Sequence, residues 1–265
     1  MSGPRPSQST SQRAFLGVSA LLFAISATVT IVWCASMSAM GMPMPGGWTM
    51  SMAWMRMPDQ TWLDATASFL AMWVAMMAAM MLPPLVPMLQ RYRIAVARIG
   101  STALGWLTAI VGVGYFFAWT VLGLAVFPVG IALAEIEMRQ PALSRAVPFM
   151  VGITVMAAGL LQFTPWKARQ LACCREEPRH APPLTAGIGN AWRYGLRLGR
   201  DCILCCAGLM TILLVAGVMD LRVMAAVTLA ITAERVAANG QRAAQAVGVV
   251  AVGAGVVLIA RAALV

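Results

Sequence analysis

The chain has 265 residues, of which 60% are hydrophobic and only 11% charged, and its mean hydropathy is +0.80. Soluble domains carry about a quarter charged residues, so this composition argues against a soluble protein, and it is too apolar for a disordered one. Six cysteines are too few for a disulfide-stapled scaffold of this length. These features predict an all-α fold, a polytopic transmembrane helix bundle.

Apolar runs of about 20 residues, the length that crosses a bilayer core of about 30 Å, define the predicted spans. Six of them cover residues 15–33, 65–89, 103–131, 147–166, 202–218 and 243–260. A seventh candidate, 223–238, is shorter and contains two charged residues. We therefore expect six to seven spans in a single domain, 15–265, after a cytoplasmic tail at 1–14. A Met-rich outer loop at 36–62 and a basic cytoplasmic loop at 167–201 complete this prediction.

The basic residues predict the orientation of the bundle, because cytoplasmic segments of membrane proteins are enriched in Lys and Arg. With the N-terminus in the cytoplasm, the inner segments hold 14 of the 19 basic residues: Arg5, Arg13, Arg91, Arg93, Arg98, Lys167, Arg169, Arg175, Arg179, Arg193, Arg197, Arg200, Arg235 and Arg242. We expect a multi-pass protein of the bacterial inner (cytoplasmic) membrane, with the C-terminus outside. The same bias accounts for most of the net charge of +10, so the expected partner is the lipid bilayer and not nucleic acid.

Fourteen of the 21 methionines lie between Met37 and Met88. Eight of them fall in the predicted outer loop: Met37, Met40, Met42, Met44, Met50, Met52, Met55 and Met57. A loop rich in Pro and Gly has no core for these side chains to fill, although they could anchor it at the membrane interface. Thioether sulfur is a soft, neutral ligand that selects Cu(I). The pattern therefore favours metal handling, with interfacial anchoring as the alternative.

The second predicted span carries a second group of methionines. Residues four apart share a helix face, so Met72, Met76 and Met80 form one ladder, and Met77 and Met81 belong to the neighbouring one. Ordinary packing is the alternative, because the flexible thioether fills core gaps well. A Met-x-x-x-Met step within a membrane also resembles the arrangement that copper transporters use. We take these five methionines as candidate Cu(I) ligands.

Five of the six cysteines fall on the predicted cytoplasmic side, where thiols stay reduced. Cys202, Cys205 and Cys206 share one helix face, and Arg200 at the membrane surface would favour a thiolate there. We predict a Cu(I) site, with Zn(II) as a second candidate ion, in this region. Its candidate ligands are Cys173, Cys174, Cys202, Cys205, Cys206 and Met210. The alternative is that these cysteines are small packing residues.

Other polar residues offer little chemistry. The single histidine, His180, is expected to be a solvated loop residue, so haem with two His ligands has no ligands here and no haem is expected. Glu234 is the one acidic residue expected within a span, where acidic groups are usually functional. Arg235 beside it suggests a simpler interpretation, an interfacial ion pair. Without a catalytic constellation, we do not expect an enzyme.

Several motifs occur in an order that resembles a known family. They are MWVAMMAAMMLP at 72–83, QFTPWK at 162–167, the Cys173-Cys174-Arg175 loop, Cys-x-x-Cys-Cys at 202–206 and Glu234-Arg235. From about residue 60 onward the chain resembles a bacterial family of predicted metal-binding integral membrane proteins, some of whose members are labelled copper chaperones. The resemblance implies a copper-related role in a membrane.

Together these features predict an integral membrane Cu(I)-binding protein that delivers or transports copper through Met and Cys ligands. Its partners would be a copper-receiving membrane enzyme or other membrane subunits. Three alternatives stay open. A transporter of an organic substrate would need a polar midplane site, for which few side chains are available. A thiol oxidoreductase would use Cys202 and Cys205, although only Cys34 lies on the outer side. A structural subunit of a larger membrane assembly would use methionine as filler.

Overall fold

The computed structural model describes residues 6–38, 41–45, 47–56, 60–98, 103–175 and 187–264. Met40, Met57 and His180, which the sequence analysis singled out, lie outside these ranges. The described residues form eight α-helices: α1 Pro6–Ser38, α2 Trp62–Arg98, α3 Leu104–Arg139, α4 Pro141–Leu161, α5 Pro165–Arg175, α6 Ile188–Gly217, α7 Leu221–Val236 and α8 Gly240–Ala262.

Six of these helices, α1, α2, α3, α4, α6 and α8, are long and apolar enough to cross a membrane. The prediction of an all-α bundle with six to seven spans is therefore confirmed. α7 covers the predicted seventh span with 16 residues. At 1.5 Å per residue it is about 24 Å long, somewhat shorter than a bilayer core of about 30 Å.

Several helices extend beyond the predicted apolar runs. α1 begins at Pro6 rather than at residue 15, and α6 begins at Ile188 rather than at residue 202. An apolar run marks the part of a helix that can contact lipid. The helix continues into polar residues where their side chains face away from the lipid. In the first turns of α6, Arg193 is exposed while Gly195 is buried against α3.

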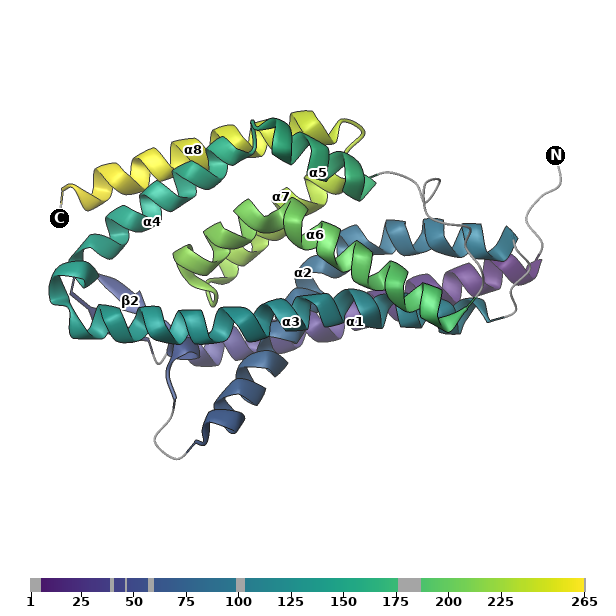
Figure 1. Ribbon diagram of the computed structural model, residues 1–265, viewed down its shortest axis with the longest axis horizontal. Helices are drawn as coiled ribbons and strands as arrows, with labels where there is room; N and C mark the ends of the chain where they lie inside the picture. Colours follow the sequence, from purple (N-terminus) through teal and green to yellow (C-terminus); the bar gives the residue numbers. More distant parts are fainter. Residues whose placement is uncertain are drawn as a thin grey trace.

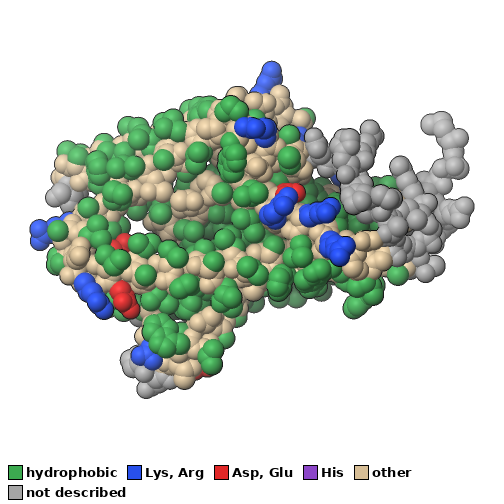
Figure 2. Space-filling model, viewed as in Figure 1, with side chains coloured by type: hydrophobic (Ala, Val, Ile, Leu, Met, Phe, Trp, Pro, Cys, Tyr) green, Lys and Arg blue, Asp and Glu red, His purple; other side chains and the backbone are tan. Residues whose placement is uncertain are grey.

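The helices pack in pairs, antiparallel for α4 with α8 and parallel for α3 with α6, and these pairs set the shape of the molecule. α8 lies along α4, α6 lies along α3, and α2 contacts α1, α3 and α7 (Figure 1). The two ends of the chain lie at opposite ends of the longest axis (Figure 1). In the space-filling view, hydrophobic side chains extend over the full length of the helices, while charged side chains are few (Figure 2). Such a surface suits contact with lipid.

α2 contains three prolines, Pro83, Pro84 and Pro87, within its 37 residues. Proline removes a backbone donor and clashes with the preceding turn, so it bends a helix. The two parts of α2 run in different directions (Figure 1). The first part carries the predicted Met ladder, and the second leads toward the end of the bundle where α6 begins.

The predicted outer loop contains a short antiparallel hairpin of β1 (Met42–Met44) and β2 (Trp48–Met50), followed by the 3-10 helix η1 (Met52–Trp54). The hairpin is attached to the start of α4, because Trp48 Nε1 donates to the Ser144 carbonyl at 3.0 Å and Ser144 Oγ donates to the Pro45 carbonyl at 3.1 Å. Met50 is 2% exposed and Met42 is 40% exposed. The methionines of this segment therefore do not share one environment.

Candidate metal centre

Four sulfur atoms gather where α2, α6 and α7 meet. Cys202 Sγ lies 3.9 Å from Cys206 Sγ and 3.9 Å from Met81 Sδ. Met88 Sδ belongs to the same group, because Arg235 contacts both it and Cys202. We call these four residues the sulfur cluster. All of them are buried, so this part of α6 faces the protein interior.

Two hydrogen-bond donors converge on the sulfur of Cys202. Tyr115 Oη of α3 donates to it at 3.0 Å and Arg235 Nη1 of α7 at 2.9 Å. Arg235 Nη2 also donates to Met88 Sδ, at 3.3 Å. The guanidinium therefore bridges a thiol and a thioether from two different helices. Arg200, which the sequence analysis placed next to the cysteines, instead pairs with Asp201 at the surface. That expectation was wrong because Arg200 lies on the exposed face of α6.

Close packing of α6 on α3 brings Tyr115 to Cys202. A Cβ on Gly199 would lie 2.7 Å from Ala118 Cβ and 2.9 Å from the Tyr115 carbonyl oxygen. Only glycine permits this approach of the two backbones. Because Gly199 precedes Cys202 by less than one turn, the same contact places the thiol within 3.0 Å of the Tyr115 hydroxyl.

A buried ion pair lies beside the cysteines. Lys167 Nζ of α5 contacts Glu234 Oε2 of α7 at 2.6 Å, and it donates to the Cys205 carbonyl of α6 at 2.7 Å. Burial opposes the positive charge of Lys167, but the neighbouring Cys205 and Glu234 outweigh it and raise the pKa of the amine. The ion pair that the sequence suggests between Glu234 and Arg235 is not formed, because Glu234 pairs with Lys167. Successive residues of a helix point in different directions, so the two side chains serve different partners.

Arg175 of α5 fixes the end of α7. Its Nη1 donates to the Glu234 carbonyl at 2.9 Å and its Nη2 to the Ala237 carbonyl at 2.6 Å. The last carbonyls of a helix have no partners within the helix and accept well from cations. Through Lys167 and Arg175, α5 therefore holds α6 and α7 together next to the sulfur cluster.

The two cysteines of α5 lie in different environments. Cys174 is buried, and its thiol donates to the Asp201 carbonyl at 2.9 Å. A hydrogen bond with Cys205 and burial raise the pKa of the Cys174 thiol well above its usual value. Cys173 is exposed. All six cysteines are free thiols, and among the described residues no three His, Cys, Asp or Glu side chains form a group that could hold a metal ion.

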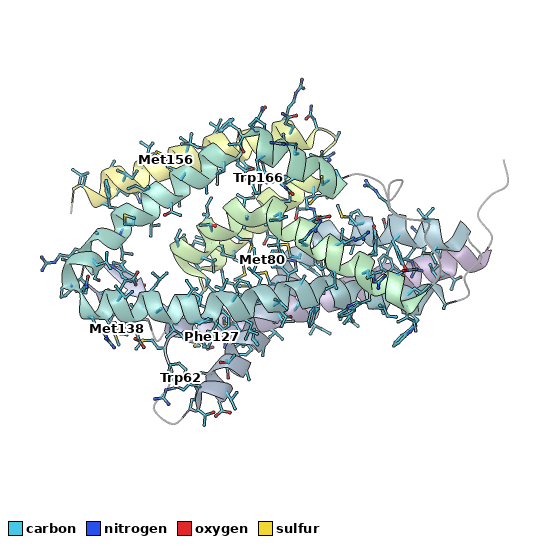
Figure 3. All side chains as sticks on the ribbon, in the orientation of Figure 1. Trp62, Met80, Phe127, Met138, Met156 and Trp166 are labelled. Atoms are coloured by element: carbon cyan, nitrogen blue, oxygen red, sulfur yellow. The ribbon has the colours of Figure 1, made fainter. Side chains whose placement is uncertain are left out.

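The methionine ladder lies inside the bundle. Met72, Met76 and Met80 are all buried, as are Met77 and Met81 of the neighbouring ladder. Met80 lies in the interior of the bundle (Figure 3). Met210 is buried one turn beyond Cys206 on α6. The structure brings Met81 to 3.9 Å from Cys202 Sγ, and it leaves Met72, Met76, Met77 and Met80 as core side chains between Met81 and the N-terminal end of α2.

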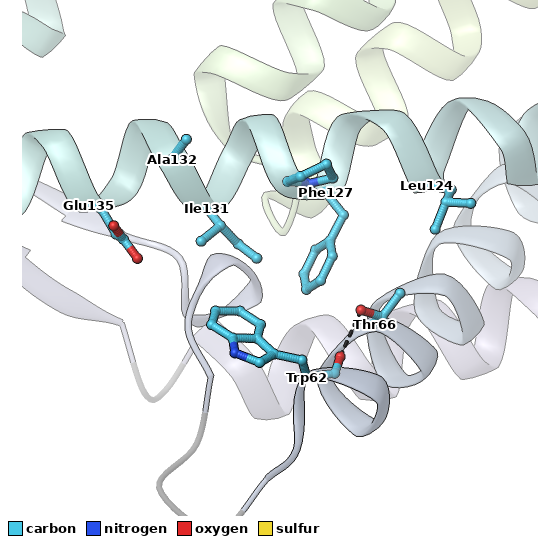
Figure 4. A pocket seen from close by; sticks show the side chains of 8 residues that line it. Trp62, Thr66, Leu124, Phe127, Ile131, Ala132 and Glu135 are labelled. Atoms are coloured by element: carbon cyan, nitrogen blue, oxygen red, sulfur yellow. Dashed lines mark hydrogen bonds between the residues drawn. The ribbon is translucent and has the colours of Figure 1, made fainter.

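A groove of about 440 Å³ lies between the start of α2 and the middle of α3 (Figure 4). Trp62, Phe127, Ile131 and Glu135 are among its lining residues, and Trp62 lies across the groove from Ile131 (Figure 4). None of its eight lining residues is Cys, Met or His. The groove therefore offers no soft ligand and is separate from the sulfur cluster.

The comparison with known families agrees with this geometry. A family model described as a copper chaperone, PpoB2, matches residues 70–258. The chain belongs to the PpoB2 copper chaperone family. The resemblance inferred from the sequence is thereby confirmed, and the family supports a copper-related role. No curated protein and no solved structure matches the chain.

The region shared with the PpoB2 family extends from α2 to α8 and contains the whole sulfur cluster. It also contains three residues around the cluster to which sequence reasoning gave no part in a metal site: Tyr115, Lys167 and Arg235. A signal existed for Lys167, which is a charged residue within the QFTPWK motif of the family resemblance. No sequence feature indicated Tyr115, because its contact with Cys202 depends on how α3 packs against α6.

Proposed function

We propose that this member of the PpoB2 family binds Cu(I) as its cargo, through Cys202, Cys206 and Met81. The observation that carries the proposal is the spacing of their sulfur atoms. With metal–sulfur bonds of about 2.3 Å, the ligands of a trigonal site lie about 4.0 Å apart. Cys202 Sγ lies 3.9 Å from both of the other sulfurs. Two thiolates and a neutral thioether are soft donors that favour Cu(I) over hard ions, and Zn(II) is the competitor at the two thiolates.

The buried methionines suggest how the ion reaches this site. A neutral thioether costs little to bury at membrane depth, whereas charged ligands would cost several kcal/mol. The ladder of Met72, Met76 and Met80 occupies the part of α2 between its outer end and Met81. We propose that it passes Cu(I) along the bundle, and that the protein delivers the ion to a copper-receiving membrane enzyme.

Metal analysis of anaerobically purified protein tests the proposal. C202S and C206S should each abolish bound Cu(I), and M81L should weaken binding while conserving volume. The matched controls are C173S, which changes an exposed cysteine, and M150L, which changes an exposed methionine of α4. Both controls should bind like the unchanged protein. Full Cu(I) occupancy in C202S would contradict the proposal. It would favour the alternative in which the cysteines are packing residues of a structural subunit.

The cysteine variants also distinguish Cu(I) binding from the alternative function, that of a thiol oxidoreductase. That enzyme was expected to use Cys202 and Cys205, whereas the sulfur neighbour of Cys202 in the structure is Cys206. Differential alkylation under turnover conditions should find all three thiols of α6 reduced. A disulfide between Cys202 and Cys205 would instead favour redox catalysis.

A further inference from the structure

The guanidinium of Arg235 occupies an unusual position for a buried cation. Arg235 is 6% exposed, and within the described part of the chain its side chain forms no ion pair with a carboxylate. The carboxylate nearest in sequence, Glu234, is engaged by Lys167. Both terminal nitrogens of Arg235 contact sulfur instead, at 2.9 Å for Cys202 and 3.3 Å for Met88. Its Nε is buried without a hydrogen-bond partner.

A buried charge is costly unless it is paired or well hydrogen-bonded. Among the described residues, the groups that accept hydrogen bonds from the charged end of Arg235 are two of the four residues of the sulfur cluster. The guanidinium therefore uses the same sulfur atoms that a soft metal ion would use. It also lies between α2 and α7, since Met88 belongs to the first helix and Arg235 to the second.

We propose that Arg235 is a resident cation of the metal-free sulfur cluster, which an entering monovalent soft ion must displace from Cys202 and Met88. This inference rests on the proposed function and adds to it a group of the protein, the guanidinium, that competes with the ion for the sulfur atoms. Two positive charges cannot share one buried thiol at contact distance without strong repulsion. When a monovalent ion enters, one positive charge replaces another on the sulfurs. The Arg235 side chain has several rotatable bonds, so its guanidinium can leave the sulfurs while α7 stays in place.

Displacement also changes the ligand set. While Arg235 Nη2 donates to Met88 Sδ, the lone pair of that thioether is engaged. Once the guanidinium has left, Met88 is free to join Cys202, Cys206 and Met81. The cluster then offers two thiols and two thioethers, from α2 and α6.

The decisive variant is R235M, because it removes the cation and introduces a thioether of similar length. Competition against a chromophoric Cu(I) chelator should show that R235M binds Cu(I) about tenfold more tightly than the unchanged protein, or better. A purely structural role of Arg235 would weaken binding instead. R235K retains a cation and should stay close to the unchanged protein. R242M, the matched control, removes an exposed arginine at the start of α8 and should have no effect.

The outcomes separate this inference from the function on which it rests. If the unchanged protein binds Cu(I) and R235M binds it equally or more weakly, the inference is overturned while the proposed function stands. If neither binds Cu(I), both fail. Tighter binding in R235M together with unchanged binding in R235K and R242M supports displacement. Should R235M not accumulate in membranes, R235Q removes the same charge and carries the same prediction.

Discussion

Lys167 and Glu234 form an ion pair of 2.6 Å in which the side chains are 5% and 1% exposed. The two residues come from α5 and α7, 67 positions apart in the sequence. Glu234 Oε1 has no hydrogen-bond partner in the part of the chain that the structure describes, so Lys167 supplies most of the compensation for the carboxylate. Substitution of either residue alone therefore leaves the charge of the other unpaired inside the bundle.

We expect K167M to destabilise the protein by about 3–5 kcal/mol, because it leaves Glu234 buried and unpaired. Thermal unfolding in detergent measures the effect. The double variant K167M/E234M removes both charges and should recover most of the lost stability, since well-packed apolar residues often replace a buried pair without cost. A double variant as unstable as K167M would show that Lys167 acts mainly through the Cys205 carbonyl.

The contact between α6 and α3 gives a second prediction. In G199A the added Cβ would press on Ala118 and on the Tyr115 backbone, so the two helices must separate by a few tenths of an ångström. We expect a loss of about 1–3 kcal/mol in stability and weaker Cu(I) binding, because Tyr115 moves away from Cys202. G189A is the matched control on the same helix, since nothing lies within 4 Å of its new Cβ. Equal behaviour of the two variants in thermal unfolding and chelator competition would contradict this account.

The methionine ladder can be tested by substitutions that keep volume but remove sulfur. Each Met-to-Leu change should cost less than about 1.5 kcal/mol in packing. We expect M72L/M76L/M80L to retain expression and thermal stability while copper-dependent maturation of an acceptor enzyme falls. Because Met77 and Met81 could substitute, the stricter variant changes all five methionines.

The result that would assign the ladder to packing alone is full copper-dependent function in the five-residue variant. The control is the pair M138L and M150L, which changes two exposed methionines and should leave function intact.

The orientation of the bundle is a further prediction. α8 runs antiparallel to α4, with Gly152 facing Gly255 and Gly159 facing Val252, and the chain ends lie at opposite ends of the molecule (Figure 1). We therefore expect the termini on opposite sides of a membrane, which requires α7 to complete a crossing. With the basic residues inside, a reporter that is active in the cytoplasm should work at the N-terminus, and one that is active outside should work at the C-terminus. The reverse pattern would exchange the compartments of all the ligands.

Sequence periodicity could predict which residues of one helix share a face. The spacing of Cys202, Cys205 and Cys206 predicted a common face, and the structure buries all three cysteines. The same rule placed the methionines of α2 in ladders, and these are buried as well. Hydropathy likewise predicted the spans, because lipid-crossing helices need long apolar runs.

Contacts between helices could not be predicted in this way. Arg235 reaches Cys202 only because α7 folds back against α2 and α6. Cys173 and Cys174 were expected to act as a pair in a loop. The segment is helical instead, so consecutive side chains diverge and only Cys174 faces α6. The residue pattern of one helix does not indicate which neighbouring helix contacts it.

The antiparallel pairing of α4 and α8 has a consequence for biogenesis. α4 leaves the ribosome about eighty residues before synthesis of α8 begins, and 67 residues separate Lys167 from Glu234. During that interval Lys167 lacks its carboxylate partner, and the glycines of α4 lack the helix that packs against them. The four residues of the sulfur cluster, by contrast, all belong to α2 and α6, so they are synthesised before Arg235 of α7. A chain stalled before α7 would hold the four sulfur atoms of the cluster without Arg235 and with Lys167 unpaired.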